Sequence, residues 1–177
     1  PSWALGTGGT RFGRLPLGGE PSTLEDKVKD VGLLHALNKS SGAISLHIPW
    51  DIPQDYDSIR KIAADLDLKF DAVNSNTFQD DQYRFGSLTH IDKKIRQAAI
   101  DHHFECIDIM GETGSQDVKI WLADGSNYPG QVNIRARQDR LHESLQAIYE
   151  RLGDNQRMVL EYKFFEPAFY HTDVPDW

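Results

Sequence analysis

The sequence alternates short strand-like segments with helical ones along most of its length, and this alternation constrains the fold most strongly. Apolar residues at helical spacing predict helices at 23–38, 56–66, 92–110 and 133–152. The predicted inward face of the first helix consists of Leu24, Val28, Val31, Leu34 and Leu37. Strands are predicted at 2–5, 43–48, 69–73, 118–122 and 158–163. Strict strand–helix alternation is typical of a parallel sheet with crossover helices, so the expected fold class is α/β.

Polar and aromatic residues gather after the strands and not after the helices. Those at or just beyond the strand ends are Trp3, His47, Trp50, Asp51, Asn74, Asn76, Trp121, Asp124, Glu161 and Lys163. In doubly wound sheets and in (β/α)8 barrels, the chemistry lies at the carboxyl ends of the strands. This asymmetry favours a barrel enzyme.

The length decides how much of a barrel the chain can supply. A complete (β/α)8 barrel needs about 250 residues, whereas this chain has 177 and ends in a predicted loop. We expect a partial TIM-barrel domain over residues 1–177, with about the first five strands and four helices; an open α/β sheet is the alternative. We expect truncation at the C-terminal end, and also at the N-terminus, because the first residue is Pro1.

Charge and composition exclude several classes of protein. The net charge of −8 argues against a nucleic-acid binder, which usually presents a basic face. No apolar run approaches the ~20 residues of a membrane helix, and no signal peptide is visible. A single cysteine, Cys106, cannot form an internal disulfide and lies in an apolar helical pattern, so we expect it to be buried. The expected location is cytoplasmic.

Glu161 and Lys163 lie on one face of the last predicted strand, about 7 Å apart. A carboxylate at an inward strand end can bind hard divalent cations, which makes Glu161 the strongest candidate metal ligand. It is one ligand where a site needs three or four, and no other residue forms a set with it by spacing. Lys163 could pair with Glu161, bind a substrate oxygen or form a Schiff base.

His47 is either a core histidine bonded to backbone or a hydrogen-bonding partner for a substrate. Three aromatic residues, Trp3, Phe78 and Trp121, could each be core; together at one rim they fit a wall that stacks on the apolar face of a sugar. The segment that begins at Asp124 has the composition of a turn, and a turn is enough to explain it. Three histidines, His90, His102 and His103, have no partner spacing, and we expect them to be solvated.

A glycine-rich stretch at 6–21 carries Arg11 and Phe12. No helix starts directly after its glycines, so a dinucleotide-binding fingerprint is not met. A loop that acts as a lid is the better interpretation.

Six segments resemble L-rhamnose isomerase of the broad-specificity bacterial type, within the xylose-isomerase-like barrels. They are SWALGTGGTRFGR at 2–14, SLHIPWD at 45–51, FDAVNSNTF at 70–78, RFGSLTH at 84–90, WLADGSNYPGQ at 121–131 and EYKFFEPAFY at 161–170. The resemblance implies a (β/α)8 barrel that interconverts aldoses and ketoses, typically L-rhamnose and L-rhamnulose. It also implies two divalent ions, commonly manganese, and a homotetramer.

The resemblance assigns roles position by position. It implies that Glu161 is a metal ligand and that Lys163 lies near the substrate O1 and the catalytic water. His47 would contact the sugar oxygens, beside a hydrophobic wall of Trp3, Phe78 and Trp121. Phe12 would reach the site of a neighbouring subunit. The remaining metal ligands would come from strands beyond residue 177.

Two other functions remain open from the sequence. One is a Schiff-base aldolase that uses Lys163. The other is a non-catalytic sugar-binding barrel fragment, because a half barrel has two unpaired sheet edges. We expect the 177-residue chain alone to be inactive as an isomerase.

Overall fold

The computed structural model describes residues 1–6, 8, 17–125 and 132–162 of the chain. In this part of the chain the strands are β1 (Ala43–His47), β2 (Lys69–Asn74), β3 (Asp117–Leu122) and β4 (Arg157–Tyr162). The α-helices are α1 (Leu24–Asn38), α2 (Tyr56–Asp65), α3 (Lys93–Thr113) and α4 (Ile134–Glu150), and two 3-10 helices are η1 (Ser2–Ala4) and η2 (Asp81–Tyr83).

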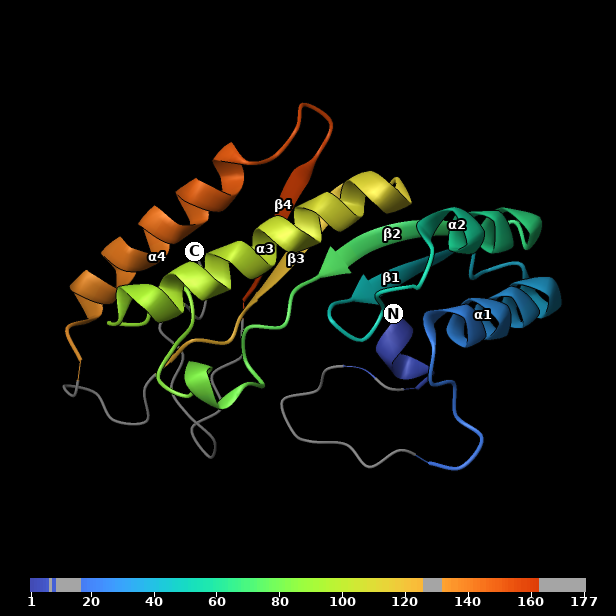
Figure 1. Ribbon diagram of the computed structural model, residues 1–177, viewed down its shortest axis with the longest axis horizontal. Coiled ribbons are helices and arrows are strands. Elements are labelled where there is room, and N and C mark those ends of the chain that lie inside the picture. The colour runs from blue at the N-terminus through green and yellow to red at the C-terminus, as the bar shows by residue number, and fades with distance from the viewer. Residues whose placement is uncertain (7, 9–16, 126–131, 163–177) are drawn as a thin grey trace.

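The four strands form one parallel sheet whose spatial order, β1-β2-β3-β4, is the order of the chain. Helices α2, α3 and α4 connect successive strands, and Figure 1 shows the helices on the same side of the sheet. A doubly wound sheet reverses its strand order and carries helices on both faces, whereas a barrel does neither. The fold is therefore a partial (β/α)8 barrel, as the sequence predicts.

Side-chain caps fix where the helices begin. Thr23 accepts a hydrogen bond from the Asp26 backbone N–H, and Asp55, Asp92 and Asn133 cap the three later helices in the same way. Helix α3 ends at Gly114, whose φ of +76° places it in the left-handed region that glycine adopts without strain.

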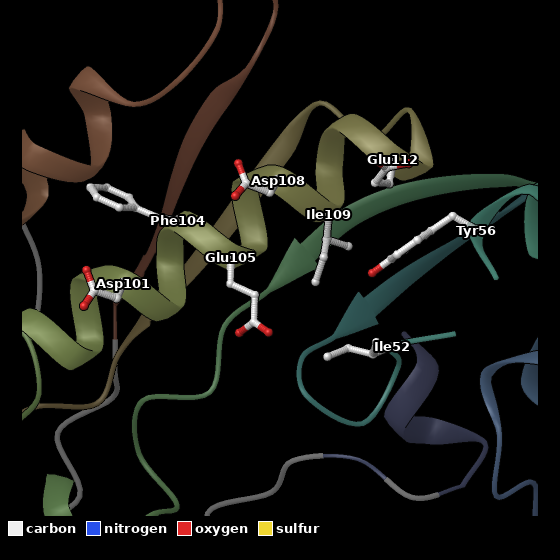
Figure 2. Close-up of a pocket in the computed structure, with 8 residues that line it drawn as sticks. All are labelled: Ile52, Tyr56, Asp101, Phe104, Glu105, Asp108, Ile109 and Glu112. Atoms are coloured by element: carbon white, nitrogen blue, oxygen red, sulfur yellow. The ribbon is translucent and has the colours of Figure 1, made fainter. Parts of the chain in front are cut away.

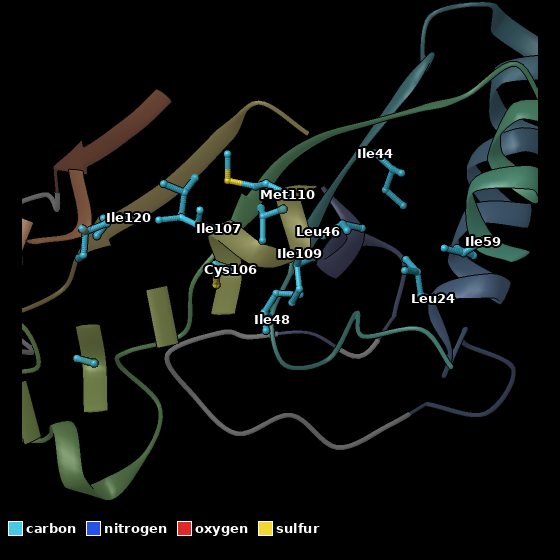
Figure 3. Close-up of a cluster of buried hydrophobic side chains, with 14 of the residues drawn as sticks. Leu24, Ile44, Leu46, Ile48, Ile59, Cys106, Ile107, Ile109, Met110 and Ile120 are labelled. Carbon is cyan, nitrogen blue, oxygen red and sulfur yellow. The ribbon is translucent and has the colours of Figure 1, made fainter. Parts of the chain in front are cut away.

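The core lies between the sheet and the helices (Figure 3). Strand β3 shows the pattern most clearly, because Val118, Ile120 and Leu122 are buried while the residues between them are half-buried. The alternation assigns one face of β3 to the core and leaves the other facing the interior of the incomplete barrel. The candidate site is built on this second face and on the loops at its carboxyl end.

Two expectations about the first elements are wrong. Residues 2–5 do not form a strand, because the Ser2 side chain bonds to Asp51 and backbone bonds from Ala4 and Leu5 close a 3-10 turn. On α1, Leu34 and Leu37 are exposed, although their spacing places them on the apolar face. Lys27 and Gly32 take inward positions instead, and a Cβ on Gly32 would lie 2.7 Å from a Leu66 methyl.

In the described residues, no helix combines the length and the apolar character needed to cross a membrane.

Candidate active site

His47 lies at the carboxyl end of β1 and is 4% exposed. Neither ring nitrogen meets the geometry of a hydrogen bond to another described residue, although the Ser75 backbone lies near the ring. Burial lowers its pKa to about 4, and the Asp51 carboxylate and the Ser75 backbone offset only part of that effect. The imidazole is therefore neutral at pH 7. A buried, neutral ring with free nitrogens can both donate and accept one hydrogen bond, which suits a polar ligand.

Aromatic rings surround this imidazole. The ring of His47 lies 5.1 Å from Trp3, 5.0 Å from Trp50 and 5.9 Å from Phe78, centroid to centroid. Phe78 in turn meets Trp121 edge-on at 5.0 Å. The structure thus places Trp3 and Phe78 against His47, extends the group to Trp121 through Phe78, and adds Trp50. We call these four rings with His47 the aromatic array.

The inner face of the sheet places further polar groups beside the array. His47 is paired in register with Asn74, and Asn74 with Lys119, so these three side chains lie at one level across β1, β2 and β3. The Asn74 amide donates to the backbone oxygen of Leu46 at 2.7 Å, which fixes that side chain. At this level the inner face of the sheet is polar, whereas the opposite face of the same strands packs in the apolar core.

Glu161 lies on the inner face of β4, where its Oε2 is 2.7 Å from Lys119 Nζ. The side chains are 48% and 35% exposed, so this carboxylate is accessible and is not a buried charge. The sequence pattern did not identify Lys119 as the partner of Glu161. Alternation along β3 does place Lys119 on the same face as Trp121, two residues later. Lys163 and Phe12 lie outside the described residues.

Glu161 is a candidate ligand for a metal ion at this face of the sheet. Glu161 is a hard oxygen donor of the kind that Mn²⁺ or Mg²⁺ accepts. Among the described residues, no three His, Cys, Asp or Glu side chains come together as a metal site. Glu161 could therefore hold a metal only together with ligands from outside the described part of the chain.

Asp124, at the end of β3, has a role that its turn composition does not reveal. Its carboxylate accepts hydrogen bonds from the backbone N–H and hydroxyl of both Ser87 and Thr89, at 2.6–2.9 Å. These bonds hold the loop after η2 against the barrel rim. Beneath this junction, a small cavity of about 10 Å³ borders Trp121 and Asp124, and it is too small for a sugar.

The expectation that the three other histidines are solvated is wrong. His103 is fully buried and its Nδ1 lies 2.7 Å from the Ala99 oxygen, and burial lowers its pKa to about 4. His90 is 8% exposed and accepts from the Asp92 N–H. These residues face the sheet or a loop, which periodicity along one helix does not reveal.

His102 connects α3 to the loop that carries Phe78. Its Nε2 accepts a hydrogen bond from the Asn76 backbone N–H at 3.0 Å, and its Nδ1 lies 3.0 Å from Glu105 Oε2. Because Nε2 accepts, the proton of a neutral ring resides on Nδ1 and points to the carboxylate. Cys106, one turn further, is buried as expected, and burial raises the pKa of its thiol.

A surface groove of about 430 Å³ lies on the outer side, between α3 and the start of α2 (Figure 2). It is lined by Ile52, Tyr56, Asp101, Phe104, Glu105, Asp108, Ile109 and Glu112. Each of its four carboxylates has a partner: Gln97 for Asp101, His102 for Glu105, Arg151 for Asp108 and Arg60 for Glu112. The groove is on the helical layer and not at the inner face of the sheet.

Comparisons with known proteins find two curated relatives that are similar to this chain over its whole length. A probable sugar isomerase of Rhizobium meliloti (strain 1021) is 46% identical over 182 aligned positions, which cover 100% of this chain and 42% of the relative. A probable sugar isomerase of Mesorhizobium japonicum is 44% identical with the same coverage. The chain therefore spans less than half the length of these curated relatives. No protein-family model matches it.

Solved structures share the fold at low sequence identity. A D-allulose 3-epimerase from Methylomonas sp. gives a TM-score of 0.60 at 15% identity, over 85% of this chain and 48% of that one. An L-ribulose 3-epimerase gives 0.60 at 16% identity, over 86% and 48%. The chain aligns with about half of each structure, so these likenesses establish that its fold is that of part of a TIM barrel.

Proposed function

We propose that this chain forms the first half of a metal-dependent aldose–ketose isomerase whose substrate pair is L-rhamnose and L-rhamnulose. The observation that carries the proposal is His47, a buried neutral imidazole with unpaired ring nitrogens at the centre of the aromatic array. The similarity to two probable sugar isomerases over the full chain supports the reaction class. The choice of L-rhamnose follows the sequence resemblance described above.

His47 would bind a hydroxyl or carbonyl oxygen of the open-chain sugar. Since its pKa is about 4, it holds one proton at neutral pH and has one nitrogen free to accept. In a buried position this hydrogen bond is stronger than in water, because the surroundings screen it poorly. A sugar oxygen placed there satisfies a ring that is otherwise without a partner in the described structure.

The aromatic array would bind the apolar side of the sugar. Trp3, Phe78 and Trp121 present faces and edges around the imidazole, and such rings bind the C–H groups of a sugar while excluding water. Excluding water strengthens the polar contacts inside the site and protects the reacting carbons from side reactions.

A metal pair, when bound, would polarise the two sugar oxygens between which hydrogen is transferred. Glu161 is the residue of this chain that we propose as a ligand, and Lys163 is proposed near the O1 oxygen, where a positive charge stabilises a developing oxyanion. Mn²⁺ is the proposed ion. A homotetramer in which Phe12 contacts a neighbouring subunit's site, and a cytoplasmic location, complete the proposal.

The test is isomerase activity of the full-length protein that contains this chain. We expect manganese-dependent conversion of L-rhamnose to L-rhamnulose, loss of activity with a chelator, and a loss of roughly 100-fold or more in kcat/KM for His47→Phe. Glu25→Gln is the control, since Glu25 forms an exposed ion pair with Lys29 on α1. Full activity in the chelator, or with His47→Phe, contradicts the proposal, and borohydride trapping of Lys163 identifies a Schiff-base aldolase instead.

The 177-residue chain alone is expected to give no turnover, because the described residues hold no complete metal-ligand set. Measurable manganese-dependent conversion by this chain would show that its own residues complete the site.

A further inference from the structure

We propose that Asp51 is a positioning residue that holds Trp3 and His47 in their mutual arrangement. The proposal deepens the function proposed above and rests on it for the role of these two rings. Asp51 follows β1 by four residues and is completely buried. It is not part of the aromatic array, so its effect on a bound sugar is indirect.

The carboxylate of Asp51 joins three separate segments of the chain. Oδ1 accepts a hydrogen bond from Lys27 Nζ of α1 at 2.6 Å, and both side chains are 0% exposed. Oδ2 accepts from the His47 backbone N–H at 2.7 Å and from the Ser2 hydroxyl of η1. One buried anion thus connects the N-terminal segment, the end of β1 and the first helix.

These bonds fix the two residues that matter for the site. The Ser2 hydroxyl anchors the residue directly before Trp3, and the His47 N–H anchors the strand residue whose ring meets that indole at 5.1 Å. Gly8 closes the arrangement from another side, since a Cβ there would lie 2.4 Å from the Trp3 Cβ. Trp3 is therefore anchored by Asp51 through Ser2, and its Cα and Cβ lie close to the backbone at Gly8.

A carboxylate is required for this task because every partner donates a hydrogen bond and none accepts one. Lys27, the Ser2 hydroxyl and the His47 amide are all donors here, and an ionised carboxylate can accept from all three. An Asn in its place brings an NH₂ group that faces one of these donors. Both oxygens are occupied by protein donors, which excludes direct contact with a sugar as the main role of Asp51.

Ser2→Ala is the sharpest variant because it removes one hydroxyl and leaves the buried ion pair intact. The readout is ¹⁹F NMR of the full-length protein labelled with 5-fluorotryptophan, with resonances assigned by single Trp→Phe variants. We expect the Trp3 resonance to shift and to gain solvent exposure in Ser2→Ala, while that of Trp121, which packs on Phe78, stays in place. Ser2→Thr retains a hydroxyl and should restore the Trp3 resonance.

Asp51→Asn is expected to shift the Trp3 resonance further, and Glu25→Gln, in the exposed pair on the same helix, to shift neither. An unchanged Trp3 resonance in folded Ser2→Ala and Asp51→Asn overturns the proposal. In kinetics, Ser2→Ala should raise KM severalfold with little change in kcat, as expected for looser sugar binding. The NMR result does not depend on turnover, so its failure and the failure of the proposed isomerase activity are distinguishable.

Discussion

Lys119 and Glu161 form an ion pair across β3 and β4, with 2.7 Å between Nζ and Oε2. In register, Glu161 is opposite Trp121, so the pair runs diagonally across the inner face beside the aromatic array. Both side chains are substantially exposed, and such pairs add little to stability. The ammonium keeps an accessible carboxylate in a defined orientation at the rim where the chemistry of barrels takes place.

Replacing Glu161 should weaken metal binding. In the full-length protein, Glu161→Gln is expected to lower Mn²⁺ affinity by roughly 100-fold or more, because it removes the anionic oxygen that we propose as a ligand. Isothermal titration with Mn²⁺ alone measures this directly. Lys119→Met is the matched variant, and we expect it to bind Mn²⁺ as tightly or more tightly, since a competing cation is gone. Wild-type affinity in Glu161→Gln would remove Glu161 from the metal site.

Replacing Asp124 should destabilise the barrel rim by an amount that depends on the substitute. Asp124→Ala leaves the buried donors of Ser87 and Thr89 without their acceptor, at a cost of roughly 2–4 kcal/mol in the free energy of unfolding. Asp124→Asn should cost less, because its amide oxygen can replace Oδ2 while the NH₂ group donates to the Ser87 hydroxyl. Urea denaturation of the three proteins gives the order, and equal stability of all three contradicts this account.

The sequence predicts the fold class well because local signals and topology agree. Helix caps such as Thr23 and Asp92, and the alternation of β3, are readable from neighbouring residues. The gathering of aromatic residues at one rim also follows, since parallel strands place their carboxyl ends together. Contacts between different elements could not be predicted from the sequence, because they depend on strand register and on the paths of loops. Examples are the contacts of Asp124 with Ser87, Lys119 with Glu161, and His102 with Asn76.

The same reason explains the errors on α1 and in residues 2–5. A helical stripe predicts Leu37 as inward, yet it is 76% exposed while Lys27, a charged residue, is fully buried. The ion pair with Asp51 compensates the burial of that charge, and the partner lies 24 residues away. Trp3 packs against His47, and no short-range rule links these two segments of the chain.

The stability of the chain should fall below pH 6.5, partly because of His47. Its pKa is about 4 in the folded state against an ordinary 6.5, so between these values the unfolded chain binds a proton that the folded one does not. Stability is therefore complete above pH 6.5 and declines by about 1.4 kcal/mol per pH unit for this residue as the pH falls toward 4. His103 acts in the same direction.

His47→Phe should make this pH dependence shallower. Urea midpoints of wild type and variant between pH 7 and pH 5 give the two slopes, and their difference isolates the contribution of His47. Identical slopes would mean that the ring takes up its proton as readily in the folded state as in the unfolded one.

Cys106 should resist thiol reagents as long as the chain is folded. It is buried, and burial raises the pKa of its thiol, so the reactive thiolate is scarce at neutral and mildly alkaline pH. With Ellman's reagent at pH 8 we expect no rapid release of chromophore from the native chain and one equivalent per chain in urea. Fast stoichiometric reaction of the native chain would show that this face of α3 opens readily.

The stability costs of replacing Lys27 and Asp51, which form a buried pair, should be strongly non-additive. Lys27→Met removes the buried cation that pairs with Asp51, and Asp51→Asn removes the buried anion 2.6 Å from the Lys27 ammonium, so each should cost roughly 3–5 kcal/mol in the free energy of unfolding. The double variant removes both charges, and its cost should be well below the sum of the two. Glu25→Gln, in the exposed pair on the same helix, should change stability little. Additive costs in urea denaturation would show that the two side chains are anchored independently, and Asp51 would then hold Ser2 and His47 without help from α1.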